Sequence, residues 1–433
     1  MAQPPLRPRH YGRIDQLVMR TFADVGDETH EARARAAAVT VTESLRPRPA
    51  RPRLIPTAEG GIARMLITVP SYAVADEPLS SVYRGLLLAL PATTALVVLA
   101  HESTAAQVRR WLAEAQRTKT STVVEAPDHI NFSVWAEDGY VVVRDDETGT
   151  TEFVEPFSFP RYGDSLVADF VANATDLDKT QAPLYFQGGN VLVGDDFFFI
   201  GADYPAESLR YMGSVLIPAA GESPAKFVHR LYGEYLDPGR RLIYLASTVP
   251  VPAEQRRKIQ LDGQEWTEEV FVGNKAGTVQ PIFHIDMFVA LAGGRRVLVG
   301  DPRMAAEVLE TPLQPHAMAE VFDAVARSLD GLGFEVVRNP LPLAYVDDPE
   351  KKVRTWYFAT SNNALVHAPA SGRPAVFLPT YGHGPWESLA ATDRRNREVW
   401  EGLGFDVRQL GDFHPFASNL GALHCIKKYL ARD

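Results

Sequence analysis

Cys425 is the only cysteine among the 433 residues of the sequence. A lone thiol cannot form an internal disulfide or build a cysteine metal site by itself, so its remaining roles are packing or reactivity. A reactive thiolate needs a nearby acid or base, a site that holds the electrophile, and charge that favours the anion. Three other segments supply such groups: Trp135-Ala-Glu-Asp138, Gln187-Gly-Gly-Asn190 and Phe283-His284-Ile-Asp286-Met-Phe288.

The order of these segments resembles one known superfamily. Trp135 to Asp138, Gln187 to Asn190, His284 to Phe288 and Gly421 to Cys425 match, in sequence, the motifs of the guanidine-modifying (pentein) enzymes. The similarity is to the deiminase branch, which contains agmatine deiminases and peptidyl-arginine deiminases. Each motif alone is common, and the signal comes from four motifs in the right order.

The resemblance implies a chemistry for each of four residues. Asp138 and Asp286 would hold the guanidinium group, because a carboxylate accepts two N–H bonds in the fork geometry that a guanidinium presents. Cys425 would attack the guanidinium carbon and form a covalent thiouronium intermediate, with its thiol pKa lowered by His284 and by the bound cation. His284 would act as general acid and base, so that water completes the hydrolysis to a ureido product and ammonia.

Five further residues are weaker candidates for substrate binding. Trp135 is expected in the pocket wall, although core packing explains a tryptophan equally well. The two glycines of the Gln187 to Asn190 segment, Gly189 among them, would let the backbone approach a ligand, and the amides of Gln187 and Asn190 would bind its polar end. A plain tight turn is the alternative. Asn363 matches a family asparagine that precedes an apolar strand.

Three positions depart from the agmatine deiminase pattern. Many members carry arginine at the position of Glu137, glutamate at that of Gln187, and threonine at that of Lys427. With these differences, a peptidyl-arginine or another divergent guanidine is at least as well supported as the substrate as free agmatine is. An acid at Glu137 could recognise a second positive charge.

The expected fold class is α/β. From Ala63 onward, short apolar runs such as Thr94–Leu99 and Ala375–Leu378 alternate with amphipathic helical stretches such as 104–116 and 318–332. Because side chains two apart in a strand share a face, His284 and Asp286 would face one cavity if they lie in a strand. The resemblance implies a pentein propeller of five ββαβ modules around a pseudo-fivefold axis.

Two regions are expected along the chain. Residues 1–60 contain a helical stretch near 12–38 and a proline- and arginine-rich run, 46–53, that forbids a continuous helix. They predict an extension and linker, whereas residues 61–433 form the pentein catalytic domain. The sequence contains no signal-peptide pattern and no apolar run long enough to span a membrane, which with the single cysteine favours a cytoplasmic protein.

Composition limits the partners. A net charge of −10 disfavours nucleic acid and anionic membranes and mildly attracts cations, such as a small-molecule or peptide guanidinium substrate. No metal or organic cofactor is expected, since His284 and Asp286 lack further ligands at a recognisable spacing. Homo-oligomerisation stays open. Two other functions remain as alternatives: an amidinotransferase of the same superfamily, and a non-catalytic pentein that only binds a partner.

Overall fold

Five β-sheets repeat one arrangement, in which the middle strand pairs antiparallel with a first strand and parallel with a third. The computed structural model describes residues 49–212 and 218–433. The five triplets, in the order first, middle and third strand, are β21 (Lys427–Arg432), β2 (Ile62–Val69) and β3 (Ala95–His101); β5 (Val141–Asp145), β6 (Thr151–Pro156) and β7 (Asp178–Ala182); β8 (Val191–Val193), β9 (Phe197–Gly201) and β10 (Arg241–Leu245); β13 (Val289–Leu291), β14 (Arg296–Asp301) and β15 (Glu335–Pro340); and β18 (Leu365–His367), β19 (Ala375–Thr380) and β20 (Asp406–Asp412). The expected α/β class is confirmed.

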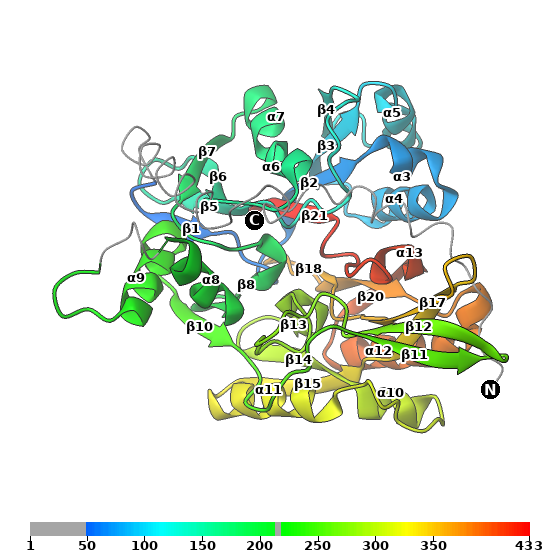
Figure 1. Cartoon of the computed structure of the whole chain (residues 1–433). Helices are drawn as coiled ribbons and strands as arrows, with labels where there is room; N and C mark the ends of the chain where they lie inside the picture. Colours follow the sequence, from blue (N-terminus) through cyan, green and yellow to red (C-terminus); the bar gives the residue numbers. More distant parts are fainter. Residues whose placement is uncertain (1–48, 213–217) are drawn as a thin grey trace.

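Helical segments connect the parallel strands of each triplet and lie towards the outside of the molecule (Figure 1). They are α3 (Ser71–Ala75) and α4 (Glu77–Ala89); α6 (Tyr162–Ser165) and α7 (Val167–Ala174); α8 (Asp203–Met212) and α9 (Pro224–Leu236); α10 (Pro302–Val308) and α11 (Ala319–Gly331); and η4 (Gly384–Leu389) and α12 (Ala390–Gly402). Local sequence sets where several begin. The side chain of Asp301 accepts hydrogen bonds from the backbone N–H of Arg303 and Met304, and Pro302 occupies the first turn of α10.

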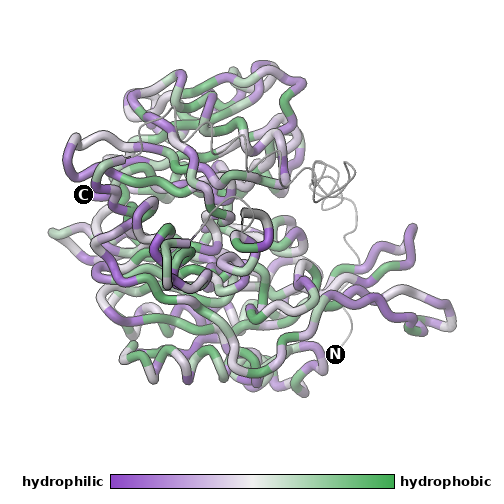
Figure 2. Tube along the Cα trace, turned by 60° about the vertical axis from the view of Figure 1, so that its left-hand side comes forward, coloured by the Kyte–Doolittle hydropathy of each residue, from purple (hydrophilic) through white to green (hydrophobic). Residues whose placement is uncertain are grey.

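The remaining elements extend these sheets or support the last strand. β1 (Pro52–Leu54) pairs with β5, and β4 (Ser121–Ala126) follows β3 after α5 (Ala105–Glu114). The short α13 (His414–Ala417) precedes β21, which lies beside β2 near the middle of Figure 1. Apolar strand segments alternate with hydrophilic loops along the trace (Figure 2). The strands therefore form the buried framework from which the loops project.

A sixth sheet does not follow this arrangement and was not expected from the sequence. Its strands are β11 (Gln255–Leu261), β12 (Gln264–Val270), β17 (Val353–Phe358) and β16 (Leu343–Asp348). The two-residue turn Asp262–Gly263 joins β11 to β12, and both residues have positive φ, 50° and 73°. An Asp-Gly pair suits this turn because aspartate tolerates and glycine readily adopts the left-handed conformation.

Two site segments form short 3₁₀ turns. Gly188–Asn190 form η2, in agreement with the tight turn given as the alternative for this segment, and β8 begins at Val191. Ile285–Met287 form η3, so the assumption that His284 and Asp286 share the face of a strand was wrong. The backbone N–H of Ile285 donates to the side chain of Asn190 at 2.9 Å, in place of a bond to a neighbouring strand.

The predicted helix within 12–38 lies outside the described residues. Of the predicted linker, Pro52–Leu54 pair with β5, so this part belongs to a sheet. The division into 1–60 and 61–433 otherwise stays a prediction. Within 49–212 and 218–433, no helix has the length and apolar character needed to cross a membrane.

Candidate active site

The predicted site residues occupy equivalent places in the five repeated sheets. Asp138, Asn190, Asp286, Asn363 and Cys425 each lie one to three residues before the first strand of a different triplet, namely β5, β8, β13, β18 and β21. Side chains at the same end of equivalent strands can converge although they are far apart in the sequence. The contacts described below show that they do.

Cys425 lies in a turn before β21, and its side chain is buried. The amide nitrogen of Asn363 donates to Sγ at 3.2 Å, and Oδ2 of Asp286 lies 3.5 Å from Sγ. The amide oxygen of Asn363 accepts the backbone N–H of His424 at 2.7 Å and of Cys425 at 3.2 Å. Nδ1 of His424 lies 2.9 Å from the same Oδ2 of Asp286. One asparagine thus fixes both the backbone and the sulfur of Cys425.

His284 is held from two sides. Its Nε2 lies 2.8 Å from Oε1 of Gln187, and its ring lies against that of Phe283, with centroids 4.0 Å apart and the planes tilted by 30°. The amide nitrogen of Gln187 donates to the hydroxyl of Tyr185 at 3.3 Å, which orients the amide so that its oxygen faces the imidazole. Since that oxygen only accepts, Nε2 carries the proton and Nδ1 is the basic nitrogen. Nδ1 lies 3.7 Å from Oδ1 of Asp138.

Asp138 already has a guanidinium partner from within the protein. Nη2 of Arg161 lies 2.6 Å from Oδ2 of Asp138, and Nε of Arg161 lies 2.5 Å from Oδ2 of Asp164. Asp164 in turn accepts the backbone N–H of Ser133 at 2.5 Å and its hydroxyl at 2.6 Å. This chain of contacts orients Asp138 with one oxygen bound to Arg161 and the other turned towards His284.

Glu137, the neighbour of Asp138, faces two lysines. Its carboxylate oxygens lie 2.7 Å from Nζ of Lys427 and 2.8 Å from Nζ of Lys428, and all three side chains are buried. Burial, with the nearby charge of Lys428, lowers the pKa of Lys427 to about 8, against the opposing effect of Glu137. Glu137 is therefore bound within the protein, and the idea that it recognises a second charge on the substrate was wrong.

Three buried groups of the site favour their neutral forms. Burial, together with Asp286 and Asp138, raises the pKa of the Cys425 thiol well above its usual value. Burial, together with Asp138 and Glu137, raises the pKa of Asp286 well above its usual value. Burial lowers the pKa of His284 to about 4, with Arg161 acting in the same direction and Asp138 opposing. The thiol pKa in the protein without substrate thus shifts opposite to the lowering expected from the sequence.

Two glycines are required by close approaches. A Cβ atom on Gly189 would lie 2.6 Å from Nδ1 of His284 and 3.2 Å from Oδ1 of Asp138. One on Gly421 would lie 2.2 Å from the ring of Trp135. Gly189 therefore leaves room for the facing imidazole and carboxylate, and the Gly421 contact shows that Trp135 packs directly against the segment that leads to Cys425.

The three groups expected to handle substrate each keep one uncommitted polar atom. Oδ1 of Asp138, Oδ1 of Asp286 and Nδ1 of His284 are buried and have no hydrogen-bond partner among the described residues. Leaving a buried polar atom unbonded costs about 1–3 kcal/mol, so such atoms concentrate where a ligand completes the bonding. The cluster contains two carboxyl oxygens and a basic nitrogen, which suits a ligand with several N–H donors.

Asn190, Gln187 and Asn363 serve the protein's own contacts in place of the predicted substrate contacts. Asn190 is fully buried, its Oδ1 accepts from Gln280 and Ile285, and its Nδ2 donates to Gln280 at 3.1 Å. Gln187 bonds His284, and Asn363 bonds Cys425, as described above. We therefore assign all three to positioning the site. Among 49–212 and 218–433, no group of three or more His, Cys, Asp or Glu side chains is arranged to hold a metal ion.

Sequence reasoning missed Arg161, Asp164 and the pairing of Glu137 with Lys428. Arg161 follows a proline in a segment without a motif, and nothing local marks it as a partner of Asp138. Two departures from the family pattern, an acid at 137 and a lysine at 427, could have indicated this pairing. Opposite charges at two unusual positions suggest contact.

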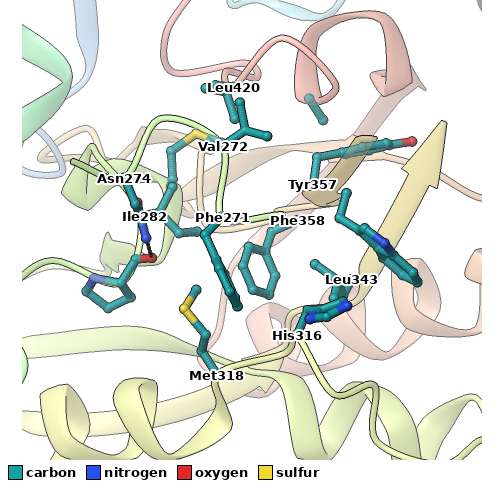
Figure 3. A pocket seen from close by; sticks show the side chains of 14 residues that line it. Phe271, Val272, Asn274, Ile282, His316, Met318, Leu343, Tyr357, Phe358 and Leu420 are labelled. Atoms are coloured by element: carbon teal, nitrogen blue, oxygen red, sulfur yellow. Dashed lines mark hydrogen bonds between the residues drawn. The ribbon is translucent and has the colours of Figure 1, made fainter. Parts of the chain in front are cut away.

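A mainly apolar pocket lies beside segments of the site. Figure 3 shows side chains of the segment 271–274, of β17 and of the segment before Cys425 turned towards it. Met287, next to Asp286, also lines it. The pocket therefore borders the candidate active site.

Comparison with solved structures identifies the fold. An X-ray structure of a provisionally assigned agmatine deiminase matches with a TM-score of 0.60 and 13% identity, over 88% of this chain and 96% of the other. Agmatine deiminase from C. jejuni matches with a TM-score of 0.54 and 13% identity, over 87% of this chain and 96% of the other. No protein-family model and no curated protein matches the chain. The chain thus has the fold of agmatine deiminases, as the motifs implied.

Proposed function

We propose that the protein is a hydrolase of linear amidines that deiminates a substituted guanidine to a ureido product and ammonia. The observation that carries this proposal is the set of buried, uncommitted atoms on Asp138, Asp286 and His284, beside the thiol of Cys425. A guanidinium offers five or six N–H donors in one plane, and two carboxylate oxygens are its best acceptors. The fold shared with agmatine deiminases supports the same assignment.

The charge of the buried cluster suits one additional cation. Asp138, Asp164, Asp286 and Glu137 provide four carboxyl groups, whereas Arg161, Lys427 and Lys428 provide three cations. With a protonated Asp286, as its raised pKa favours, the free site is balanced. Binding a guanidinium would then favour loss of that proton. The guanidinium and the ionised Asp286 would then form a buried pair of opposite charges, and burial strengthens their attraction.

The substrate would help to create its own nucleophile. A bound cation lowers the pKa of a nearby thiol and so opposes the effect of Asp286 and Asp138 on Cys425. The thiol proton passes to Nδ1 of His284 as Sγ forms a bond to the guanidinium carbon. The imidazolium then protonates the departing nitrogen, ammonia leaves, and a thiouronium remains on Cys425.

Water resolves the intermediate in the proposed second half. His284 accepts a proton from water as the oxygen bonds to the thiouronium carbon, and the carbon–sulfur bond then breaks. The products are a ureido group and the thiolate, which recovers its proton. Gln187 keeps Nδ1 free for both proton transfers because it occupies Nε2.

The proposal includes the substrate class, which comprises small molecules or peptides with a guanidinium group. The site segments follow one another in the same order as the motifs of the pentein enzymes. This order also supports a pentein arrangement, in which the five repeated sheets surround a pseudo-fivefold axis. An amidinotransferase would use the same four residues and pass the amidino group to an amine.

The two activities are separated by stoichiometry. Purified protein is incubated with agmatine, arginine or an arginyl peptide amide, and ammonia and ureido product are measured together. The proposal expects one ammonia for each ureido group, without an added amine. Amidino transfer that requires an added amine and releases no ammonia would establish the amidinotransferase. If none of the three guanidines reacts under either condition, the proposed function is wrong.

A further inference from the structure

The apolar pocket shares its loops with the candidate catalytic residues. Ile282 lies two residues before His284, Met287 follows Asp286, and Leu420 lies five residues before Cys425. Ligand atoms in this pocket would contact the segments that position all three groups. The pocket thus lies beside the segments that carry three of the candidate catalytic residues.

Met287 links the pocket lining to the residue that holds the thiol. Its Sδ lies 3.6 Å from the amide nitrogen of Asn363, which donates to Sγ of Cys425 at 3.2 Å. Met287, which lines the pocket, therefore directly contacts the amide that holds the sulfur. Methionine is adaptable in shape, so this part of the lining can adjust to a bound group.

The sixth sheet and the segment after β12 supply the opposite walls. Phe271, Val272, Leu343 and Trp356 are partly exposed and line the pocket, together with the buried Phe358. In Figure 3, Phe271 and Phe358 point into the same space. The strands that were added to the five repeated sheets thus create an apolar surface beside the site.

The polar groups of the lining are bonded elsewhere. The amide nitrogen of Asn274 donates to the carbonyl oxygens of Pro252 and Pro281, the indole N–H of Trp356 donates to Glu268 at 2.7 Å, and the hydroxyl of Tyr357 lies 2.5 Å from Nδ1 of His414. The remaining polar ring is that of His316, whose Nε2 lies 3.4 Å from Oε2 of Glu268. A ligand in the pocket therefore meets mainly carbon and sulfur surfaces. Such a lining selects a compact uncharged apolar group.

We propose that this pocket is a substrate subsite for an aromatic or branched aliphatic group carried by the guanidine, which makes the preferred substrate a hydrophobic arginine derivative. This inference rests on the proposed function and specifies its substrate class. The charged amine of agmatine and the charged ends of free arginine would gain nothing from these walls. Asp138 and Asp286 would bind the guanidinium of both kinds of substrate, and the pocket would favour the substrate that carries an apolar group.

The test compares Nα-benzoyl-arginine amide with Nα-acetyl-arginine amide by ammonia release. Burying the ring is expected to favour the benzoyl compound by about tenfold in kcat/KM. Val272→Trp fills the pocket and is expected to reduce this preference to below about twofold. Val279→Trp is the matched control, because Val279 is 38% exposed and does not line the pocket. It should keep the preference.

A second variant and a binding measurement separate the possible failures. Leu343→Phe fills the pocket from the sixth sheet and should act like Val272→Trp if the latter does not fold. Calorimetry with Nα-benzoyl-glycine amide, which has the ring but no guanidine, should show binding to the wild type and at least tenfold weaker binding to either filled variant.

The outcomes distinguish the subsite from the proposed chemistry. Binding of the glycine amide without turnover of either arginine amide would preserve the apolar site and overturn deimination. Equal turnover of both arginine amides would overturn the substrate subsite, whether or not the glycine amide binds. A benzoyl preference that persists in both filled variants would also overturn it.

Discussion

Glu137 and Asp138 are adjacent acids with opposite environments. Both oxygens of Glu137 are bound by lysines, Lys427 on one and Lys428 on the other. Asp138 shares only Oδ2 with Arg161, and its Oδ1 has no hydrogen-bond partner in the described part of the chain. A fully paired buried charge serves the fold, because its bonding is complete. A half-paired one retains the capacity to bind a ligand.

A large loss of stability is expected when the complete pairing is broken. Glu137→Gln removes the charge that compensates two buried lysines, which should reduce the free energy of unfolding by about 3 kcal/mol. Denaturant unfolding measures this loss. Glu125→Gln is the matched control, because its ion pair with Arg109 is exposed and should contribute less than about 1 kcal/mol. Equal losses in the two variants would remove the structural role of Glu137.

The imidazole beside Asp138 should make stability depend on pH. Burial lowers the pKa of His284 to about 4 in the folded protein, from the ordinary histidine value of 6.5. Since the folded pKa is the lower one, the neutral imidazole stabilises the fold above pH 6.5, and this stability is lost as the pH falls to 4. The expected loss is about 3 kcal/mol. The raised pKa of Asp286 acts in the opposite direction, so a difference between variants is needed.

That difference is measured between wild type and His284→Gln by denaturant unfolding at about pH 7 and about pH 4.5. The variant should lose less stability than the wild type over this range, whereas His229→Gln, at an exposed position, should behave like the wild type. Parallel pH dependence of wild type and His284→Gln would show that the imidazole is not held neutral by burial.

The half-paired acid should matter mainly for catalysis. Asp138→Asn keeps the shape of the side chain and removes the charge that would hold the guanidinium, so kcat/KM should fall about a hundredfold. Ammonia release at varied substrate concentrations measures the change. Asp146→Asn, at an exposed position after β5, is the control. An unchanged kcat/KM for Asp138→Asn would exclude Asp138 from the site.

Arg161 should have a smaller effect because it acts through Asp138. Arg161→Gln loses the ionic contact with Oδ2 and leaves the carboxylate less well oriented, which should lower kcat/KM about tenfold. Arg161→Lys keeps the charge and should lose less. Kinetics of both variants distinguish positioning from a purely structural role, since the latter would change unfolding without changing kcat/KM of the folded enzyme. Equal kcat/KM in all three proteins would contradict the positioning role.

The sequence predicted which residues converge better than it predicted the contacts that organise them. Asp138, His284, Asp286 and Cys425 carry motif signals, and their places before equivalent strands agree with repeated α/β units. The apolar runs Thr94–Leu99 and Ala375–Leu378 coincide with β3 and β19, strands of two triplets. These features are local or repetitive, so a single sequence retains them.

Long-range partners and local turns were not accessible in the same way. Arg161 and Asp138 are 23 positions apart in the sequence, and no local pattern encodes their contact. The strand expected around His284 is a 3₁₀ turn, in which the side chain of Asn190 accepts a hydrogen bond from the N–H of Ile285. The sixth sheet was missed although Asp262–Gly263 is a strong hairpin signal.

The account depends on Cys425 being the nucleophile towards a guanidinium carbon. The direct measurement is acid-quenched turnover with peptide mass mapping, alongside the rate of Cys425→Ser. The account predicts an amidino-type adduct on the peptide that contains Cys425, and at least a thousandfold slower ammonia release by Cys425→Ser, whereas the nearby control Ser418→Ala stays active. Turnover by Cys425→Ser at the wild-type rate would contradict it.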